Sequence, residues 1–181
     1  MQNQEVYSIE IAGVKRDLPI CKVDDHMSIA AFVMFSDVEI TVAAAKALLE
    51  KVPEFDIILT AESKGIPLAY EMSRQCGKKY ILARKMSKLY MKNPFSVSVK
   101  SITTQRVQTL YLDESEAAEM KGKRILIVDD VVSTGGSLDA MEYLARHTEG
   151  EIVGKAFVLA EGDAKNRDDI IFLEPLPLFF N

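Results

Sequence analysis

From Phe55 onward, short apolar runs alternate with segments that repeat apolar residues at helical spacing. Runs of this length are typical of buried strands. Strands that alternate with helices of this length form βαβ units, in which the strands are parallel. The sequence therefore predicts an α/β fold with a mainly parallel, twisted sheet flanked by helices. The expected strands are "FDIILT" (55–60), "KYILAR" (79–84), "RILIVDD" (124–130), "IVGKAFVLAE" (152–161) and "DIIFLE" (169–174).

Three segments, residues 37–51, 63–77 and 135–148, have the periodicity of helices. In each segment, apolar residues recur near helical spacing, and we expect these residues to face the sheet. They are Val38, Val42, Ala45 and Leu49 in the first segment, Ile66, Ala69, Tyr70 and Met72 in the second, and Leu138, Met141, Leu144 and Ala145 in the third.

Two further segments have no place in this alternation. Residues 1–36 precede the first helix, and we interpret them as a small hood over the core, which would comprise residues 37–181. Residues 90–112 include "FSVSVKSITTQRVQTLYL", which alternates and is rich in Ser, Thr and Val. This pattern predicts a mobile β-hairpin arm within the core domain.

Composition limits the classes of protein that this chain can belong to. Its 181 residues suit one domain with a full core, and 48% hydrophobic with 27% charged residues is ordinary for a globular protein. A net charge of −5 argues against nucleic acid as the main partner. No signal sequence or membrane span is visible, and two scattered cysteines fit a reduced cytoplasmic protein. We expect no membrane partner and a cytoplasmic location.

Two adjacent acids, Asp129 and Asp130, follow the apolar residues 125–128, and a glycine-containing turn follows the acids. Ligands of open parallel sheets bind at the carboxyl ends of the strands. Paired carboxylates at a buried strand end are costly unless cations or hydroxyls meet them. Residues 133–137 ("STGGS") supply N–H groups at a helix N-terminus, where phosphate binds. Hydrogen-bond acceptors for hydroxyls next to donors for phosphate predict a sugar-phosphate site. The alternative is that the acids only form a turn at the strand end and that residues 133–137 only cap the helix.

The stretch "ILIVDDVVSTGGS" (125–137) resembles the phosphoribosyl pyrophosphate (PRPP) signature of type I phosphoribosyltransferases, and the resemblance covers about residues 30–178. It implies that the two acids hold the ribose 2′- and 3′-hydroxyls and that residues 133–137 surround the 5′-phosphate. The PRPP-binding residues of this segment would be Asp129, Asp130, Val131, Val132, Ser133, Thr134, Gly135, Gly136 and Ser137.

A second anion-binding turn is expected at "LTAESKGIPLAY" (59–70), where Lys64 would open the helix. Beside the first motif, it resembles the family's pyrophosphate loop, with "LARK" (82–85) ending the next strand. The PRPP-binding residues here would be Glu62, Ser63, Lys64, Gly65, Arg84 and Lys85. The resemblance makes Asp129, Asp130, Lys64, Arg84 and Lys85 the catalytic residues.

The arm resembles the flexible loop that closes over the reaction centre in this family. Its candidate residues are Ser96, Lys100, Ser101, Thr103, Thr104 and Arg106. Many adenine enzymes carry a glutamate in this loop, but no Asp or Glu occurs between Met91 and Leu112. A loop carboxylate is therefore not available as the general acid. The purine would contact Phe35, Val131 and Glu161.

The whole pattern is most similar to the purine branch of the family, the adenine and xanthine enzymes. This similarity implies a glycosyltransferase of purine salvage that transfers 5-phosphoribosyl from PRPP to a purine base, with adenine favoured. Xanthine or hypoxanthine-guanine phosphoribosyltransferase activity is an alternative. So is a non-catalytic PRPP-sensing regulator related to a purine-operon repressor. The cofactor would be Mg²⁺, held by PRPP and water without direct side-chain ligands, and the protein would be a homodimer.

Overall fold

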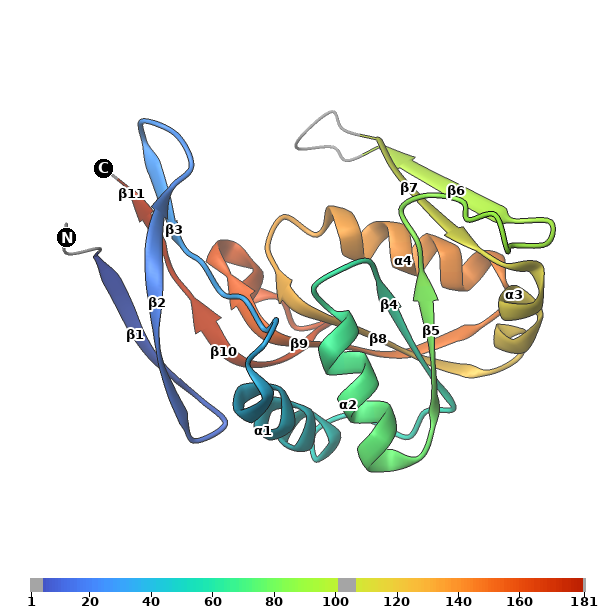
Figure 1. Ribbon diagram of the computed structural model, residues 1–181, viewed down its shortest axis with the longest axis horizontal. Coiled ribbons are helices and arrows are strands. Elements are labelled where there is room, and N and C mark those ends of the chain that lie inside the picture. The colour runs from blue at the N-terminus through green and yellow to red at the C-terminus, as the bar shows by residue number, and fades with distance from the viewer. Residues whose placement is uncertain (1–4, 101–106, 181) are drawn as a thin grey trace.

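The computed structural model describes residues 5–100 and 107–180, and a five-stranded sheet forms its centre (Figure 1). All neighbouring strands of this sheet are parallel. In sheet order they are β10 (Ile171–Leu176), β9 (Glu151–Glu161), β8 (Arg124–Val132), β4 (Ile57–Ala61) and β5 (Lys79–Ala83). The predicted α/β class and the five predicted strands are confirmed, with ends that shift by up to two residues.

Both faces of the sheet are buried, and this explains why its strands appear in the sequence as continuous apolar runs. In β8, Ile125 and Ile127 belong to one hydrophobic cluster, whereas Leu126 and Val128 belong to the other. All four side chains are fully buried. Because successive side chains of a strand point to opposite faces, each run supplies both clusters.

Helices cover the two faces. Helices α1 (Val38–Leu49) and α2 (Ile66–Cys76) pack on one face, and α4 (Gly136–His147) packs on the other, above the sheet in Figure 1. The short helix α3 (Glu114–Met120) precedes β8 and buries Met120. Nowhere in residues 5–100 and 107–180 is a helix long and apolar enough to cross a membrane.

The buried faces of α1 and α2 differ in part from those that the sequence predicts. Val38 and Val42 are 74% and 39% exposed, and Tyr70 is 57% exposed, so the prediction was wrong for these three residues. Helix α1 buries a stripe one position away, and α2 buries Glu71, which is paired with Arg74. Helix α1 contains four alanines, so its apolar residues define two possible stripes, and packing against the sheet selects between them. The buried residues are Ile40, Thr41, Ala44, Ala45 and Leu48 in α1, and Leu68, Ala69, Glu71 and Met72 in α2. The predicted face of α4 is confirmed, because Leu138, Met141, Leu144 and Ala145 are all buried.

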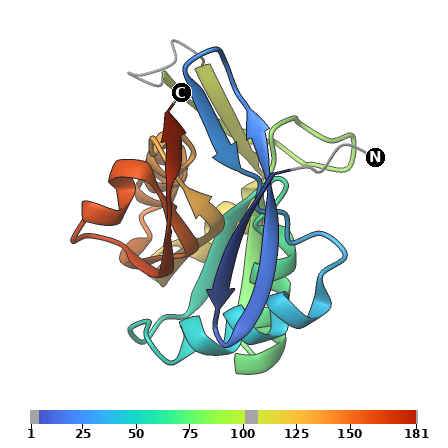
Figure 2. The same ribbon diagram turned by 90° about the vertical axis from the view of Figure 1, so that its left-hand side faces the viewer.

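A second sheet stands at one end of the core and is seen side-on in Figure 2. Its antiparallel strands are β1 (Val6–Ile11), β2 (Val14–Lys22), β3 (Met27–Ala30) and β11 (Leu178–Phe180). Strand β11 pairs with β3, so the C-terminal residues join the segment that we named the hood. The division into residues 1–36 and 37–181 stays a prediction.

The predicted arm is an antiparallel hairpin of β6 (Phe95–Lys100) and β7 (Val107–Leu112). Its base is anchored, because Val97, Leu110 and Leu112 are buried in the cluster that includes α4. The backbones of Arg84 and Tyr111 also exchange hydrogen bonds of 2.9 and 2.8 Å. Ser96 is exposed on β6, and Lys100 ends that strand. Four candidate arm residues, Ser101, Thr103, Thr104 and Arg106, lie outside the described residues.

Candidate active site

The site lies where the winding of the central sheet reverses. From β4 the chain crosses through α2 to β5, whereas from β8 it crosses through α4 to β9 and continues to β10. Strands β4 and β8 are neighbours in register, with Leu59 beside Ile127. Their carboxyl ends therefore diverge at a topological switch point, the usual ligand position in such sheets. Both motifs singled out in the sequence are at this edge.

The two acids are part of β8, which extends to Val132, so the strand is longer than predicted. Asp130 is 5% exposed, and its Oδ2 is buried without a hydrogen-bond partner in the described part of the chain. Burial and the neighbouring Asp130 charge raise the pKa of Asp129 to about 8, against the opposing charge of Lys85. Burial also raises the pKa of Asp130, and the charge of Lys64 opposes this. Asp129 Oδ1 accepts a 2.9 Å hydrogen bond from the Asp130 backbone N–H, so the unmet need of the pair lies at Asp130 Oδ2.

Of the four α-helices in the described part of the chain, two have side-chain caps and two do not. Asp37 caps α1 and Asp113 caps α3, as is usual for a helix N-terminus. Helices α2 and α4 instead have glycines, Gly65 and Gly135, at the N-cap position, and these residues have no side chain that could cap the helix. These are the two helices that start at the switch point. A glycine at the N-cap leaves no capping side chain in the way of an anion, which the helix dipole favours at this end.

Glycine is required at both helix starts, for different reasons. Gly135 has a φ of 87°, in the left-handed region that other residues rarely adopt. At Gly65 the surroundings are the constraint, since a Cβ there would lie 2.4 Å from Thr60 Oγ1 and 2.6 Å from Asp129 Oδ1. The turn at residues 62–65 therefore lies directly against the acid pair. The two segments predicted to bind anions therefore lie side by side.

Basic side chains surround this turn. Glu62 accepts a hydrogen bond from the Lys85 backbone N–H at 2.9 Å, and it pairs with Arg84 at 3.6 Å and Lys88 at 3.8 Å. Arg84 Nε is buried and has no hydrogen-bond partner among the described residues. Lys64 lies in the turn before α2 and does not open the helix as predicted, because α2 begins at Ile66.

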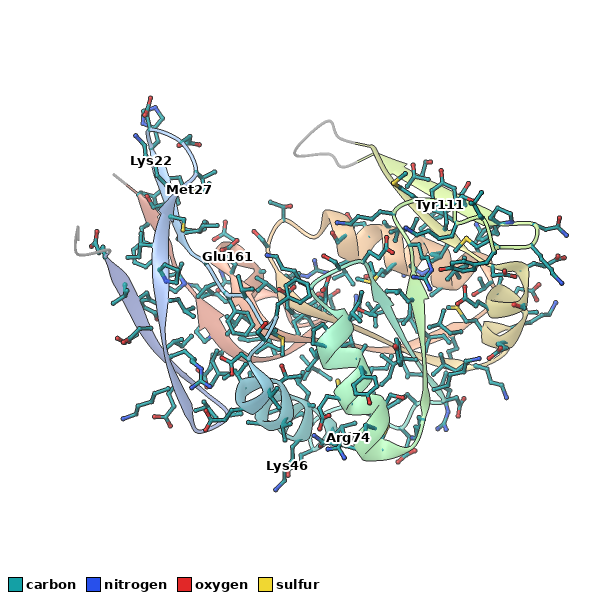
Figure 3. All side chains as sticks on the ribbon, in the orientation of Figure 1. Lys22, Met27, Lys46, Arg74, Tyr111 and Glu161 are labelled. Carbon is teal, nitrogen blue, oxygen red and sulfur yellow. The ribbon has the colours of Figure 1, made fainter. Side chains whose placement is uncertain are left out.

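The charges of Lys64 and Lys85 thus act on the acid pair, and Arg84 pairs with Glu62 of the adjacent turn, while the three purine candidates are more dispersed. Val131 is partly buried against the cluster under α1 and α2. Phe35 is 47% exposed in the connection before α1. Glu161 ends β9, between the hood sheet and the β8–α4 connection (Figure 3).

Sequence reasoning missed three polar residues at this edge. Thr60 is fully buried, and its hydroxyl has no hydrogen-bond partner within the described ranges. Lys88 pairs with Glu62, and Arg167 approaches Gly135 from the segment after β9. Thr60 stands inside a predicted strand, and the two cations lie in polar loops, so no local pattern distinguished them.

Asp129→Asn should make the protein more stable than the wild type at alkaline pH. The folded pKa of Asp129 is raised to about 8, against about 3.9 for an unfolded Asp. Between these values the folded state holds a proton that the unfolded state has released, so wild-type stability falls as pH rises. Asparagine cannot ionise and avoids this loss. We expect the variant to melt about 3–8 °C above the wild type at pH ~8.5, and close to it at pH ~4. The measurement is thermal denaturation across this pH range. If the melting temperature of the wild type exceeded that of the variant by more as pH rises, the burial argument would be contradicted.

A parallel sheet with paired acids and two uncapped helix starts at its switch point defines the type I phosphoribosyltransferase fold. The family model for the phosphoribosyl transferase domain matches residues 37–175, and the chain belongs to this family.

Individual relatives agree with this assignment. The chain is 32% identical over 122 residues to an adenine phosphoribosyltransferase of Thermotoga petrophila, covering 67% of this chain and 64% of that protein. It thus spans somewhat less than two thirds of that relative's length. It is 30% identical over 110 residues to the purine biosynthesis transcriptional repressor PurR of Bacillus subtilis, covering 60% of this chain and 38% of the repressor. The crystal structure of adenine phosphoribosyltransferase from Thermoanaerobacter pseudethanolicus has the same fold, with a TM-score of 0.66 at 20% identity over 94% of this chain and 95% of that one.

Proposed function

We propose that this protein is a purine phosphoribosyltransferase, which transfers 5-phosphoribosyl from PRPP to a purine, with adenine favoured, and releases pyrophosphate. The observation that carries the proposal is the buried acid pair between two uncapped helix N-termini. Asp130 Oδ2 needs a donor, and the two helix N-termini, which have glycine at the N-cap, each favour an anion. PRPP offers hydroxyl donors between two separate phosphate groups, and so meets all three requirements.

Each part of PRPP has a matching part of the site. Asp129 and Asp130 would accept hydrogen bonds from the ribose 2′- and 3′-hydroxyls. The backbone of residues 133–137, at the start of α4, would bind the 5′-phosphate. The turn at residues 62–65, with Lys64, Arg84 and Lys85 around it, would bind the diphosphate.

The reaction is a displacement at ribose C1. The bond from C1 to the diphosphate oxygen breaks as a bond to the purine nitrogen forms, and that nitrogen loses its proton. The transition state resembles an oxocarbenium ion, with negative charge growing on the leaving diphosphate. Lys64, Arg84 and Lys85 would stabilise this charge electrostatically. Closure of the arm would exclude water that competes for the cation.

Magnesium is the cofactor that this site fits. No three Asp, Glu, His or Cys side chains come together to hold a metal in the described ranges. The donors present, Asp129, Asp130 and Glu62, are carboxylate oxygens, which suit a hard cation that also keeps water and substrate phosphate ligands. Mg²⁺ would therefore be held mainly by PRPP and water. When bound, it neutralises part of the diphosphate charge.

A panel of bases tests the function and identifies the substrate. The protein is incubated with PRPP, Mg²⁺ and one of adenine, hypoxanthine, guanine, xanthine, uracil or orotate, and the nucleotide is separated and quantified. We expect AMP to form fastest. If PRPP binds but no base yields a nucleotide, the protein is a PRPP sensor, as the similarity to the PurR repressor would then suggest.

A homodimer in the cytoplasm completes the proposal. Three exposed apolar side chains, Val38, Val42 and Tyr70, line one groove between α1 and α2. Exposed apolar groups that gather in this way favour a protein partner, and a second copy would cover them. Analytical ultracentrifugation is the test, and a monomer at micromolar concentration would contradict the dimer.

Cys21 and Cys76 form no disulfide, consistent with a reducing compartment.

A further inference from the structure

Arg167 lies against the glycine that begins α4, although it is more than 30 positions away in the sequence. It follows the 3₁₀ helix η1 (Gly162–Asn166) at the carboxyl end of β9. A Cβ at position 135 would be 3.2 Å from Arg167 Nη1. Gly135 is itself buried, whereas Ser133 and Thr134 beside it are exposed. The guanidinium therefore lies directly beside the turn that we assign to the 5′-phosphate.

A chain of ion pairs holds the guanidinium in this position. Its Nε and Nη2 both donate to Asp169, each at 2.8 Å. Asp169 also pairs with Lys155, whose side chain is only 15% exposed. Lys155 in turn contacts Glu142 of α4 at 2.9 Å. Nη1, which faces Gly135, makes no hydrogen bond to a described residue.

The pair with Asp169 stabilises the Arg167 cation and holds it beside the start of α4. A helix N-terminus carries a partial positive charge, and a fixed arginine beside it adds repulsion. Asp139 in the first turn offsets part of this repulsion. Nη1 has no acceptor among the described residues, and the buried Asp130 Oδ2 at the end of β8 has no donor there. These observations indicate a ligand with an anionic group next to hydroxyls.

We propose that Arg167 is a phosphate-binding residue of this enzyme and that its Nη1 donates to a 5′-phosphate oxygen. The assignment rests on the proposed function and adds a residue outside the 125–137 motif. The 5′-phosphate is remote from the bond that breaks and keeps its charge during transfer. Arg167 therefore binds the ground state and the transition state equally, and its loss raises the KM for PRPP with little change in kcat.

The test compares two ligands on Arg167→Gln. Ribose 5-phosphate carries only the phosphate that Arg167 contacts, whereas inorganic pyrophosphate represents the other end of PRPP. Isothermal titration in Mg²⁺ should show the Kd for ribose 5-phosphate raised about tenfold, as expected for a lost charge-assisted hydrogen bond. The Kd for pyrophosphate should stay within about twofold of the wild type, which also reports that the variant is folded. Arg167→Lys, which keeps the charge, should retain part of the affinity.

Arg74→Gln is the matched control. Arg74 forms the same kind of pair, with Glu71 at 2.7 Å, and lies in the last turn of α2, near the lower edge of the molecule in Figure 3. The Arg74→Gln variant should bind ribose 5-phosphate and pyrophosphate with the affinities of the wild type. If the wild type binds ribose 5-phosphate and Arg167→Gln binds it equally well, the assignment of Arg167 is wrong while the proposed function stands. An equal rise in the Kd values for ribose 5-phosphate and pyrophosphate would also contradict the assignment of Arg167. If the wild type binds neither ribose 5-phosphate nor PRPP, the proposed function fails and Arg167 with it.

Discussion

Asp130→Asn should lower kcat/KM by about one to three orders of magnitude, while the protein stays folded. Asp130 is 5% exposed, and its Oδ2 has no hydrogen-bond partner among the described residues. In the proposed complex, this oxygen accepts a hydrogen bond from a ribose hydroxyl. Asparagine keeps the shape but loses the charge that makes such a hydrogen bond strong. It also removes repulsion from Asp129, so the melting temperature should not fall.

Steady-state kinetics with PRPP and adenine is the measurement for this variant. Asp17→Asn is a suitable control, because Asp17 is an exposed acid of β2 that hydrogen-bonds to Ser8, outside the site. Wild-type kcat and KM in Asp130→Asn would show that the acid pair does not hold the sugar.

Gly65→Ala should reduce kcat/KM by about 100-fold or more, since displacing reacting groups by about 1 Å has effects of this size. Its Cβ would lie 2.4 Å from Thr60 Oγ1 and 2.6 Å from Asp129 Oδ1. Neither neighbour can move without cost, because Thr60 is fully buried in β4 and Asp129 belongs to β8. Either the turn or the acid must be displaced, and both are parts of the proposed PRPP site.

The matched control for this change is Gly122→Ala. Gly122 has a φ of 68°, but nothing lies within 4 Å of the Cβ that it would gain. This variant should lose about 1 kcal/mol of stability through backbone strain and keep its activity. The pair of variants separates stability from catalysis. Normal activity in Gly65→Ala would contradict the role of residues 62–65 as the diphosphate turn.

Much of the fold could be predicted because local patterns determine it. The strands of the central sheet are buried on both faces, so each appears as an apolar run whatever its neighbours are. The acid pair and the glycine turn of residues 129–136 are contiguous, and their position at the end of a run places them at the sheet edge. Residues 62–65 are recognisable for the same reason.

The remaining features depend on contacts between distant segments. The face of α1 is decided by the sheet, since its alanines allow two stripes. Strand β11 joins the hood because the chain returns to β3 after β10, and no local pattern indicates this pairing. Arg167 lies in a polar stretch of ordinary composition, and only the fold brings it 3.2 Å from the Cβ position of Gly135.

The central claim is that one site, formed by the acid pair and the two uncapped helix starts, holds one molecule of PRPP. A crystal structure of the complex with PRPP and Mg²⁺ tests this most directly. We expect the ribose 2′- and 3′-hydroxyls within about 2.5–3.0 Å of the Asp129 and Asp130 carboxylates. The 5′-phosphate should lie on residues 133–137 and the diphosphate on residues 62–65. A ligand bound elsewhere, or a ribose that faces away from both acids, would contradict the account.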